Sequence, residues 1–292
     1  MKLLICNDGS AQADNAMRLG AAIAAACKAD VTLFGIVESP GQSQTILDSL
    51  KQGQALLEQN KINAELITKS GDPIQEIKRR TEEAHYDLVI IGAVQKKARG
   101  FFWMSSKSYK IIKEVAPPVL TFAGSGTSIK RILVCSGGKI HTDAALKLIS
   151  EIARGAGANV TIFHVLPEAP GIYSHWSLME EEDARLLDSK SELGINLRGE
   201  KEKFEALGVA TEIRFGHGPV LDEILEELRK GKYDLVVSGS ALSRSFRTYM
   251  MGDITREIVN RSDRAVLVIR GPQRSSESQG VIRGFFGRFA RF

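Results

Sequence analysis

Short apolar runs and longer amphipathic segments alternate along the first part of the chain. The runs predict β-strands at residues 2–7, 31–37, 63–68, 87–92 and 118–123. The segments between them predict helices at about 12–28, 42–60, 72–84 and 104–115. This alternation is typical of βαβ units, in which neighbouring strands run parallel and helices cover the sheet.

The same pattern returns in the second part of the chain. The run that begins at Lys2 matches the run that begins at Arg131, at an offset of 129 residues. The Tyr-Asp-Leu-Val motif at Tyr86 matches the one at Tyr233, at an offset of 147. The chain is therefore one domain duplicated. The difference between the offsets gives the second copy 18 extra residues, which we place around residues 171–185 as an added loop or helix extension.

The composition of the joining segments sets the domain boundaries. Gly124–Ser128 is rich in glycine and serine and is interpreted as a flexible linker. A second polar stretch at 271–280 predicts a disordered tether. We therefore expect domain 1 at 1–123, a linker at 124–128, domain 2 at 129–271, and a tether with a tail at 272–292.

Composition narrows the class of protein further. With 43% hydrophobic and 25% charged residues, the chain has the make-up of a globular protein, and no apolar run is long enough to span a membrane. No signal peptide is expected, and three cysteines without metal-type spacing fit a reducing cytoplasm. The net charge of +4 gives no indication of nucleic acid binding, and the scattered histidines predict no metal site.

The motifs at the strand ends resemble those of the universal stress protein family. They are Asn7-Asp8-Gly9-Ser10 after the first strand, the strand that ends at Gly92, and Pro117-Pro118-Val119-Leu120 at the last strand. The resemblance covers nearly the whole chain, in tandem form. It implies an α/β fold of two repeated open parallel five-stranded sheets with helices on both faces, the adenine nucleotide α-hydrolase-like arrangement.

The resemblance also implies where a nucleotide would bind. Family members that bind ATP carry an aspartate at the end of strand one, which meets the adenosine. They also carry Gly-x2-Gly-x9-Gly-Ser/Thr after strand four, which holds ribose and phosphates. Glycines allow backbone N–H groups to approach anionic oxygens, and a helix N-terminus favours negative charge.

Neither copy keeps this pattern intact. The first copy has Asp8 and Gly92, but Gln95 stands at the second glycine and Ser105-Ser106 at the final pair. ATP or AMP in the first copy is one interpretation, with Lys96, Lys97 and Arg99 within reach of phosphates. The alternative is that the three cations are a solvated loop and that Asp8 only turns the chain and caps the next helix.

The second copy departs further from the pattern. It has Gly137 in place of the aspartate, keeps Gly239, and has Leu242 at the second glycine. The last pair is Gly252-Asp253, and an aspartate at a helix start would repel phosphate. We therefore expect a nucleotide in the first copy rather than the second.

No complete catalytic motif appears in the sequence. Ser136-Gly137-Gly138 resembles the glycine loop of ATP pyrophosphatases, but Ile140 and His141 stand where that loop has Asp and Ser. The loop is either an anion-binding turn or, more simply, a tight turn that needs small residues. We expect a cytoplasmic stress-response or regulatory protein rather than an enzyme, with slow ATP hydrolysis left open.

Partner contacts are predicted at two places. In tandem relatives the two copies pair through their last strands, here 118–123 and 265–270, and a homodimer could add to this pseudo-dimer. Phe101–Met104 is expected to open the fourth helix, packed inside the protein or against a partner.

The C-terminal tail has the pattern of a basic amphipathic helix. Its apolar residues gather on one helical face, and its arginines lie outside that face. Three interpretations of the tail remain open. It could bind an anionic membrane surface at the inner face of the membrane, it could bind in a groove on a protein, or it could be a disordered end. The apolar face holds Val281, Ile282, Phe285, Phe286, Phe289 and Phe292, and the arginines are Arg283, Arg288 and Arg291.

Overall fold

The computed structural model describes residues 1–270 except 94, 99–100, 105, 168–175 and 241–245. In domain 1 the elements follow the expected order, with a short 3-10 turn at Pro40–Gln42 before α2. They are β1 (Lys2–Asn7), α1 (Ala11–Cys27), β2 (Asp30–Val37), α2 (Ser43–Gln59), β3 (Ala64–Ser70), α3 (Pro73–Glu83), β4 (Leu88–Gly92), β5 (Gln95–Ala98), β6 (Phe101–Met104), α4 (Ser106–Glu114) and β7 (Val119–Phe122).

After the coil at 124–128, the described residues of domain 2 repeat this order without a counterpart of β5 and β6, and one helix is added, α6, which overlaps the predicted extra residues 171–185. Residues 171–175, at the start of the predicted insertion, lie outside the described residues. The elements are β8 (Arg131–Ser136), α5 (Asp143–Ala156), β9 (Asn159–Leu166), α6 (Trp176–Asp188), α7 (Glu192–Ala206), β10 (Thr211–His217), α8 (Val220–Gly231), β11 (Leu235–Ser240), α9 (Phe246–Arg261) and β12 (Ala265–Arg270).

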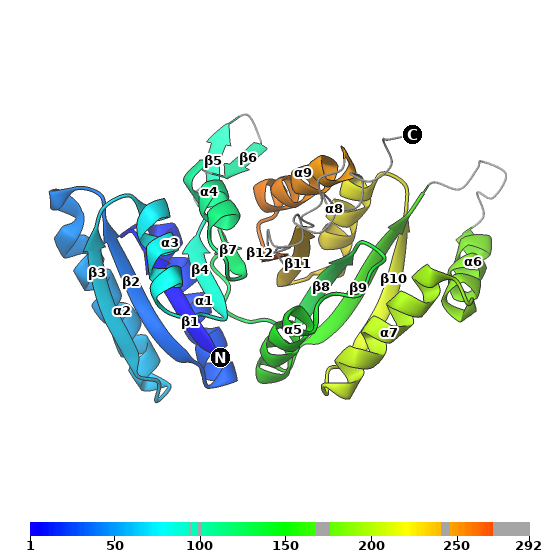
Figure 1. The fold of residues 1–292 in the computed structure, drawn as a ribbon, viewed down its shortest axis with the longest axis horizontal. Helices are drawn as coiled ribbons and strands as arrows, with labels where there is room; N and C mark the ends of the chain where they lie inside the picture. The colour runs from blue at the N-terminus through cyan, green and yellow to red at the C-terminus, as the bar shows by residue number, and fades with distance from the viewer. Residues whose placement is uncertain (94, 99–100, 105, 168–175, 241–245, 271–292) are drawn as a thin grey trace, which may run out of the picture.

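The two domains share one ten-stranded sheet, in the order β10-β9-β8-β11-β12-β7-β4-β1-β2-β3 (Figure 1). Within each domain the strands are parallel, and the domains join where β7 and β12 pair antiparallel, with Leu120 opposite Leu267. This junction confirms the predicted pseudo-dimer. Pairing also removes the unpaired edge that each last strand would otherwise present.

Helices cover both faces of this sheet. One apolar core packs α1, α2, α5 and α7 against one face through residues such as Leu50 and Phe204. The other core packs α3, α4, α8 and α9 against the opposite face through residues such as Ile77 and Ile258. Fully buried strands such as β4 fit this arrangement, because a parallel sheet covered twice has no solvent face. In the described part of the chain, no helix combines the length and apolarity needed to cross a membrane.

Local capping explains where several helices begin. The Ser10 hydroxyl accepts a hydrogen bond from the Ala13 N–H at the start of α1, and Thr142 does the same for Ala145 at the start of α5. α5 begins three residues later than α1, relative to the 129-residue offset. The chain between β8 and α5 is therefore longer than its counterpart in domain 1.

Two predicted features differ from the structure. Phe101–Met104 does not open the fourth helix but forms β6, paired antiparallel with β5 in a hairpin that contacts α9 of domain 2. Residues 252 and 253 do not stand at a helix start, because α9 already begins at Phe246. The repulsion expected between Asp253 and a phosphate at a helix N-terminus therefore does not apply.

Candidate functional site

Asp8 lies in the turn between β1 and α1, with an exposed side chain. Its Oδ1 accepts a hydrogen bond from the Ser10 N–H at 3.0 Å, while Ser10 itself caps α1. Asn7 Oδ1 accepts from the Gly9 N–H at 2.6 Å, and Gly9 has φ +80°, a conformation that favours glycine. Asp8 thus shapes the turn without capping the helix.

Gly92 is a glycine for a packing reason. A β-carbon at Gly92 would lie 2.6 Å from the backbone nitrogen of Ala13, so the end of β4 touches the first turn of α1. Gln95 begins β5 and Ser106 begins α4, whereas Ser105 lies outside the described residues. The nucleotide prediction for these residues stays a prediction.

In domain 1, an ion pair lies at the carboxyl ends of the strands. Lys107 in α4 donates a hydrogen bond to Glu38 just beyond β2. Nearby, Ile46 of α2 packs over Gly35, where a β-carbon would lie 2.6 Å from the isoleucine side chain.

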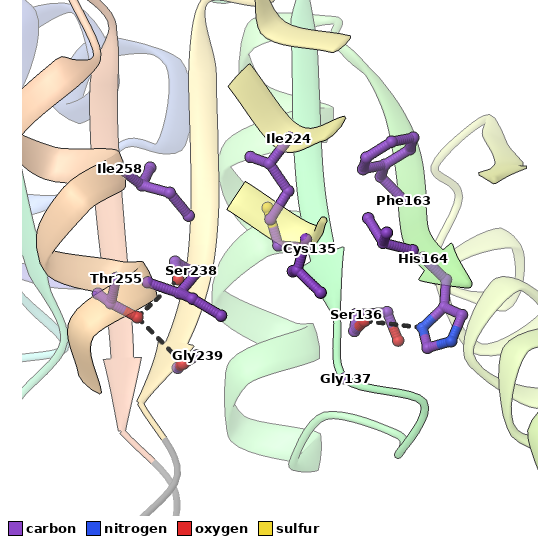
Figure 2. A pocket seen from close by; sticks show the side chains of 13 residues that line it. Cys135, Ser136, Gly137, Phe163, His164, Ile224, Ser238, Gly239, Thr255 and Ile258 are labelled. Carbon is purple, nitrogen blue, oxygen red and sulfur yellow. Dashed lines mark hydrogen bonds between the residues drawn. The ribbon is translucent and has the colours of Figure 1, made fainter. Parts of the chain in front are cut away.

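Domain 2 has a pocket at the matching place, with a cavity volume of about 260 Å³ (Figure 2). It opens at the carboxyl ends of β8, β9 and β11. In the sheet β8 lies between β9 and β11, so the connection that follows β8 leads to one side and later strands are added on the other. Ligands of open α/β sheets bind at such a switch point. The apolar part of the wall comes from Cys135, Phe163, Val165, Val220, Ile224, Ile254 and Ile258.

Polar groups also line the pocket. The hydroxyls of Ser238 and Thr255 lie 2.9 Å apart, and His164 Nδ1 lies 2.9 Å from the backbone oxygen of Ser136 (Figure 2). Gly137 and Gly239 complete the rim. Thus two of the predicted site residues of the second copy, Gly137 and Gly239, face one cavity, while Gly252 lies inside α9.

Two substitutions between the repeats change this edge of the sheet. Ile254 stands 147 residues after Lys107, and Pro167 stands 129 residues after Glu38. The ion pair across the edge of domain 1 is therefore replaced by apolar residues, and Ile254 becomes part of the pocket wall. The sequence prediction favoured domain 1 because Asp8 survives there, yet the cavity described here belongs to domain 2.

The pocket thiol is not activated. Cys135 lines the cavity, and its surroundings, which shield the thiol from water, raise its pKa to about 12. Burial, followed by the charge of Asp8, likewise raises the pKa of Cys6, which is the equivalent residue of domain 1. Both cysteines pack as small apolar side chains.

Among the described residues, the histidines outside the pocket do not form a metal centre. His217 Nε2 lies 3.1 Å from Asp183, an ion pair between β10 and α6. Within the described ranges, no group of three or more histidine, cysteine, aspartate or glutamate side chains could hold a metal ion.

Comparisons with known proteins place this fold and site in a family. The sequence model of the universal stress protein family matches residues 1–122 and 128–270. A universal stress protein from Archaeoglobus fulgidus DSM 4304 is structurally similar, with a TM-score of 0.70 and 18% identity over 92% of this chain and 98% of that chain. A protein of unknown function from Pseudomonas aeruginosa PAO1 gives a TM-score of 0.63 and 14% identity over 92% of both chains. No curated protein of similar sequence was found.

The fold and the pocket at its switch point define a tandem α/β protein of the adenine nucleotide α-hydrolase-like class. The chain belongs to the universal stress protein family, and its two matched regions are the two halves of the ten-stranded sheet. The predicted fold class and family are thereby confirmed. The predicted tail contacts, Phe285, Phe286, Phe289, Phe292, Arg283 and Arg288, lie outside the described residues.

Proposed function

We propose that this chain is a regulatory universal stress protein whose second domain binds an adenine mononucleotide. The supporting observation is the pocket at the carboxyl ends of β8, β9 and β11. Its apolar wall suits a flat base, because burying apolar surface stabilises a complex by about 25 cal/mol per Å². Its rim of hydroxyls and glycine backbone suits a ribose and a phosphate.

The size of the pocket favours AMP over ATP. A volume of about 260 Å³ is near the lower end of the range typical of ligand pockets, about 300–1,000 Å³. A base and its sugar fill such a space. A single phosphate then lies at the edge of the pocket, between Gly137 and Gly239. The longer triphosphate of ATP would extend into solvent without further contacts from this pocket.

Regulation rather than catalysis is part of the same proposal. The Ser238 and Thr255 hydroxyls hydrogen-bond to each other, and the Nδ1 atom of His164 is held by a backbone oxygen. These groups are therefore arranged to hold a ligand, not to activate a nucleophile. The rate of ATP hydrolysis with purified protein should equal the rate in buffer alone. An ATPase activity that Val220→Trp abolishes would contradict the proposal that the protein is not an enzyme.

Calorimetric titration of AMP and ATP into nucleotide-stripped protein tests the site. Val220 begins α8 at the mouth of the pocket and is 42% exposed, so Val220→Trp fills the mouth without burying a new side chain in the core. We expect micromolar AMP binding to fall at least tenfold in this variant. Ile195→Trp is the matched control, because Ile195 is 51% exposed on α7 and does not line the pocket.

The same titration is made with the Asp8→Ala variant, which tests the site in domain 1. Binding that survives Val220→Trp but is lost in Asp8→Ala would move the site to domain 1. If titration of millimolar AMP into folded wild-type protein releases or absorbs no heat, the proposal that either domain binds a nucleotide is overturned.

The sequence of the tail favours a second candidate function, as a protein that contacts an anionic membrane surface or a partner protein. Arg283, Arg288 and Arg291 would contribute about 3 kcal/mol near an anionic leaflet, and Gly284 and Gly287 oppose helix formation by about 1 kcal/mol each. These opposing terms predict weak, reversible binding. Co-sedimentation with phosphatidylserine vesicles should therefore be greater for the full chain than for residues 1–279, and equal partitioning would remove the membrane interpretation.

A further inference from the structure

Domain 2 contains a buried carboxylate–imidazole pair that its sequence motifs did not reveal. Nδ1 of His141 lies 2.6 Å from Oε1 of Glu200, which projects from α7. The Glu200 side chain is 1% exposed and that of His141 is 12% exposed. The second oxygen of Glu200, Oε2, has no hydrogen-bond partner among the described residues.

The second nitrogen of this imidazole lies beside Gly239, which lines the pocket, although His141 itself is not one of the lining residues. A β-carbon built on Gly239 would lie 3.7 Å from Nε2 of His141, and Gly239 lines the pocket. His141 also follows the Gly137-Gly138 turn, whose Gly137 lies on the opposite side of the rim. The imidazole therefore lies next to the pocket, with Gly239 of β11 between them.

Domain 1 has no counterpart of this pair. The residue equivalent to His141 is Gln12, in the first turn of α1, whose backbone is packed against Gly92. The residue equivalent to Glu200 is Gly53, where a β-carbon would lie 2.2 Å from the sulfur of Met17. Backbone packing in domain 1 is thus replaced by a buried polar pair, and the later start of α5 makes room for it.

A buried charged pair is not a means of gaining stability. Desolvation of both groups offsets their attraction, and well-packed apolar residues of similar volume are often at least as stable. What the pair provides is orientation: with Nδ1 held by the carboxylate, the ring is fixed and Nε2 is the nitrogen left to meet a ligand. In the imidazolium form both nitrogens donate hydrogen bonds.

The surroundings of Nε2 suit an anion. Thr142, the next residue, is the N-cap of α5, and helix N-termini carry partial positive charge. In the imidazolium form, with its charge balanced by Glu200, Nε2 adds a hydrogen-bond donor to the backbone N–H groups around the pocket. Together they match the acceptor oxygens of a phosphate monoester.

We propose that His141, positioned by Glu200, binds the phosphate of the nucleotide whose base and sugar occupy the domain 2 pocket. This inference rests on the proposed function and assigns the ligand class, a nucleoside monophosphate, to particular groups. The base and sugar contact the apolar wall, and the phosphate lies between the Gly137 turn, Gly239 and Nε2 of His141. Glu200 is a positioning residue, since it acts only through the imidazole.

The test compares AMP with adenosine, which lacks the phosphate. In His141→Gln we expect the affinity for AMP to fall at least tenfold, while the affinity for adenosine changes less than twofold. Tenfold corresponds to about 1.4 kcal/mol. Glu200→Gln keeps the volume and an acceptor oxygen but loses the charge, so its loss for AMP should be smaller and again specific to AMP.

His217→Gln is the control, because His217 is paired with Asp183 and does not line the pocket. Circular dichroism confirms that each variant is folded. Equal losses for AMP and adenosine in His141→Gln, or no loss for either, would overturn the role of His141 while leaving nucleotide binding intact. Wild-type protein that binds neither ligand would overturn both.

Discussion

A β-carbon added to Gly155 would lie 2.6 Å from the carbonyl oxygen of Ala26, so α5 of domain 2 and α1 of domain 1 meet backbone to backbone. The contact lies on one side of the shared sheet, away from the β7–β12 junction that also joins the domains (Figure 1). The pseudo-dimer is therefore held both by strand pairing and by close helix packing.

Gly155→Val tests this helix contact. The added side chain must push the helices apart, because its neighbour is rigid backbone rather than a flexible side chain. We expect the free energy of unfolding, measured in urea, to fall by about 1–3 kcal/mol, as for other overpacked sites. Gly126→Val serves as the control because a β-carbon there meets nothing within 4 Å. Equal stability of the two variants would show that the helices do not approach this closely.

Asp87 gives stability a defined pH dependence. Burial alone would raise the pKa of Asp87, but hydrogen bonds from the Lys2 N–H at 2.7 Å and from His85 lower it on balance. A lowered pKa in the folded state stabilises the protein above the usual value near 3.8, and this contribution is lost as the pH falls through the lower folded pKa.

The measurement is the free energy of unfolding of the wild-type protein and of Asp87→Asn, between pH 2.5 and 7. The wild type should be the more stable at neutral pH, and the difference should shrink below about pH 4. A difference that stays constant over this range would mean that the carboxylate charge plays no part in holding β4 to the start of β1.

The buried thiols should react slowly while the protein is folded. With a pKa of about 12, Cys135 carries thiolate at a fraction of about 10⁻⁴ at pH 8, against roughly a quarter for an ordinary cysteine. Alkylation of Cys135 by iodoacetamide, followed by mass spectrometry, should be on the order of 10³ slower than in urea and should rise about tenfold per pH unit. Cys27, whose pKa burial and then Glu151 raise to about 11, should react faster than Cys135. Equal rates in folded and unfolded protein would contradict this picture.

Much of the fold could be predicted because its signals are local. Strand and helix periodicity gave the element order, and repeated motifs such as those at Tyr86 and Tyr233 gave the duplication. The β5–β6 hairpin could not be predicted, since Gln95–Ala98 is polar and Phe101–Met104 is apolar throughout, so neither alternates as a half-buried strand does.

The site was harder to predict because it depends on packing. Motif comparison directed attention to Asp8, whereas the pocket wall is built from many residues, among them Ile254 in place of Lys107, a change that no binding motif includes. The His141–Glu200 pair joins residues far apart in the chain. One signal could have found it: Glu200 interrupts the apolar stripe of α7 between Leu197 and Phe204, where a buried glutamate requires a partner.

The central claim is that AMP binds in the pocket of domain 2, and hydrogen–deuterium exchange of the wild-type protein with and without saturating AMP tests it most directly. We expect slower amide exchange in residues 133–142, which hold the end of β8 and the glycine turn after it, and in residues 235–240, which form β11. The equivalent residues 4–13 and 88–93 of domain 1 should not change. Protection confined to domain 1, or no protection in either domain, would contradict the account.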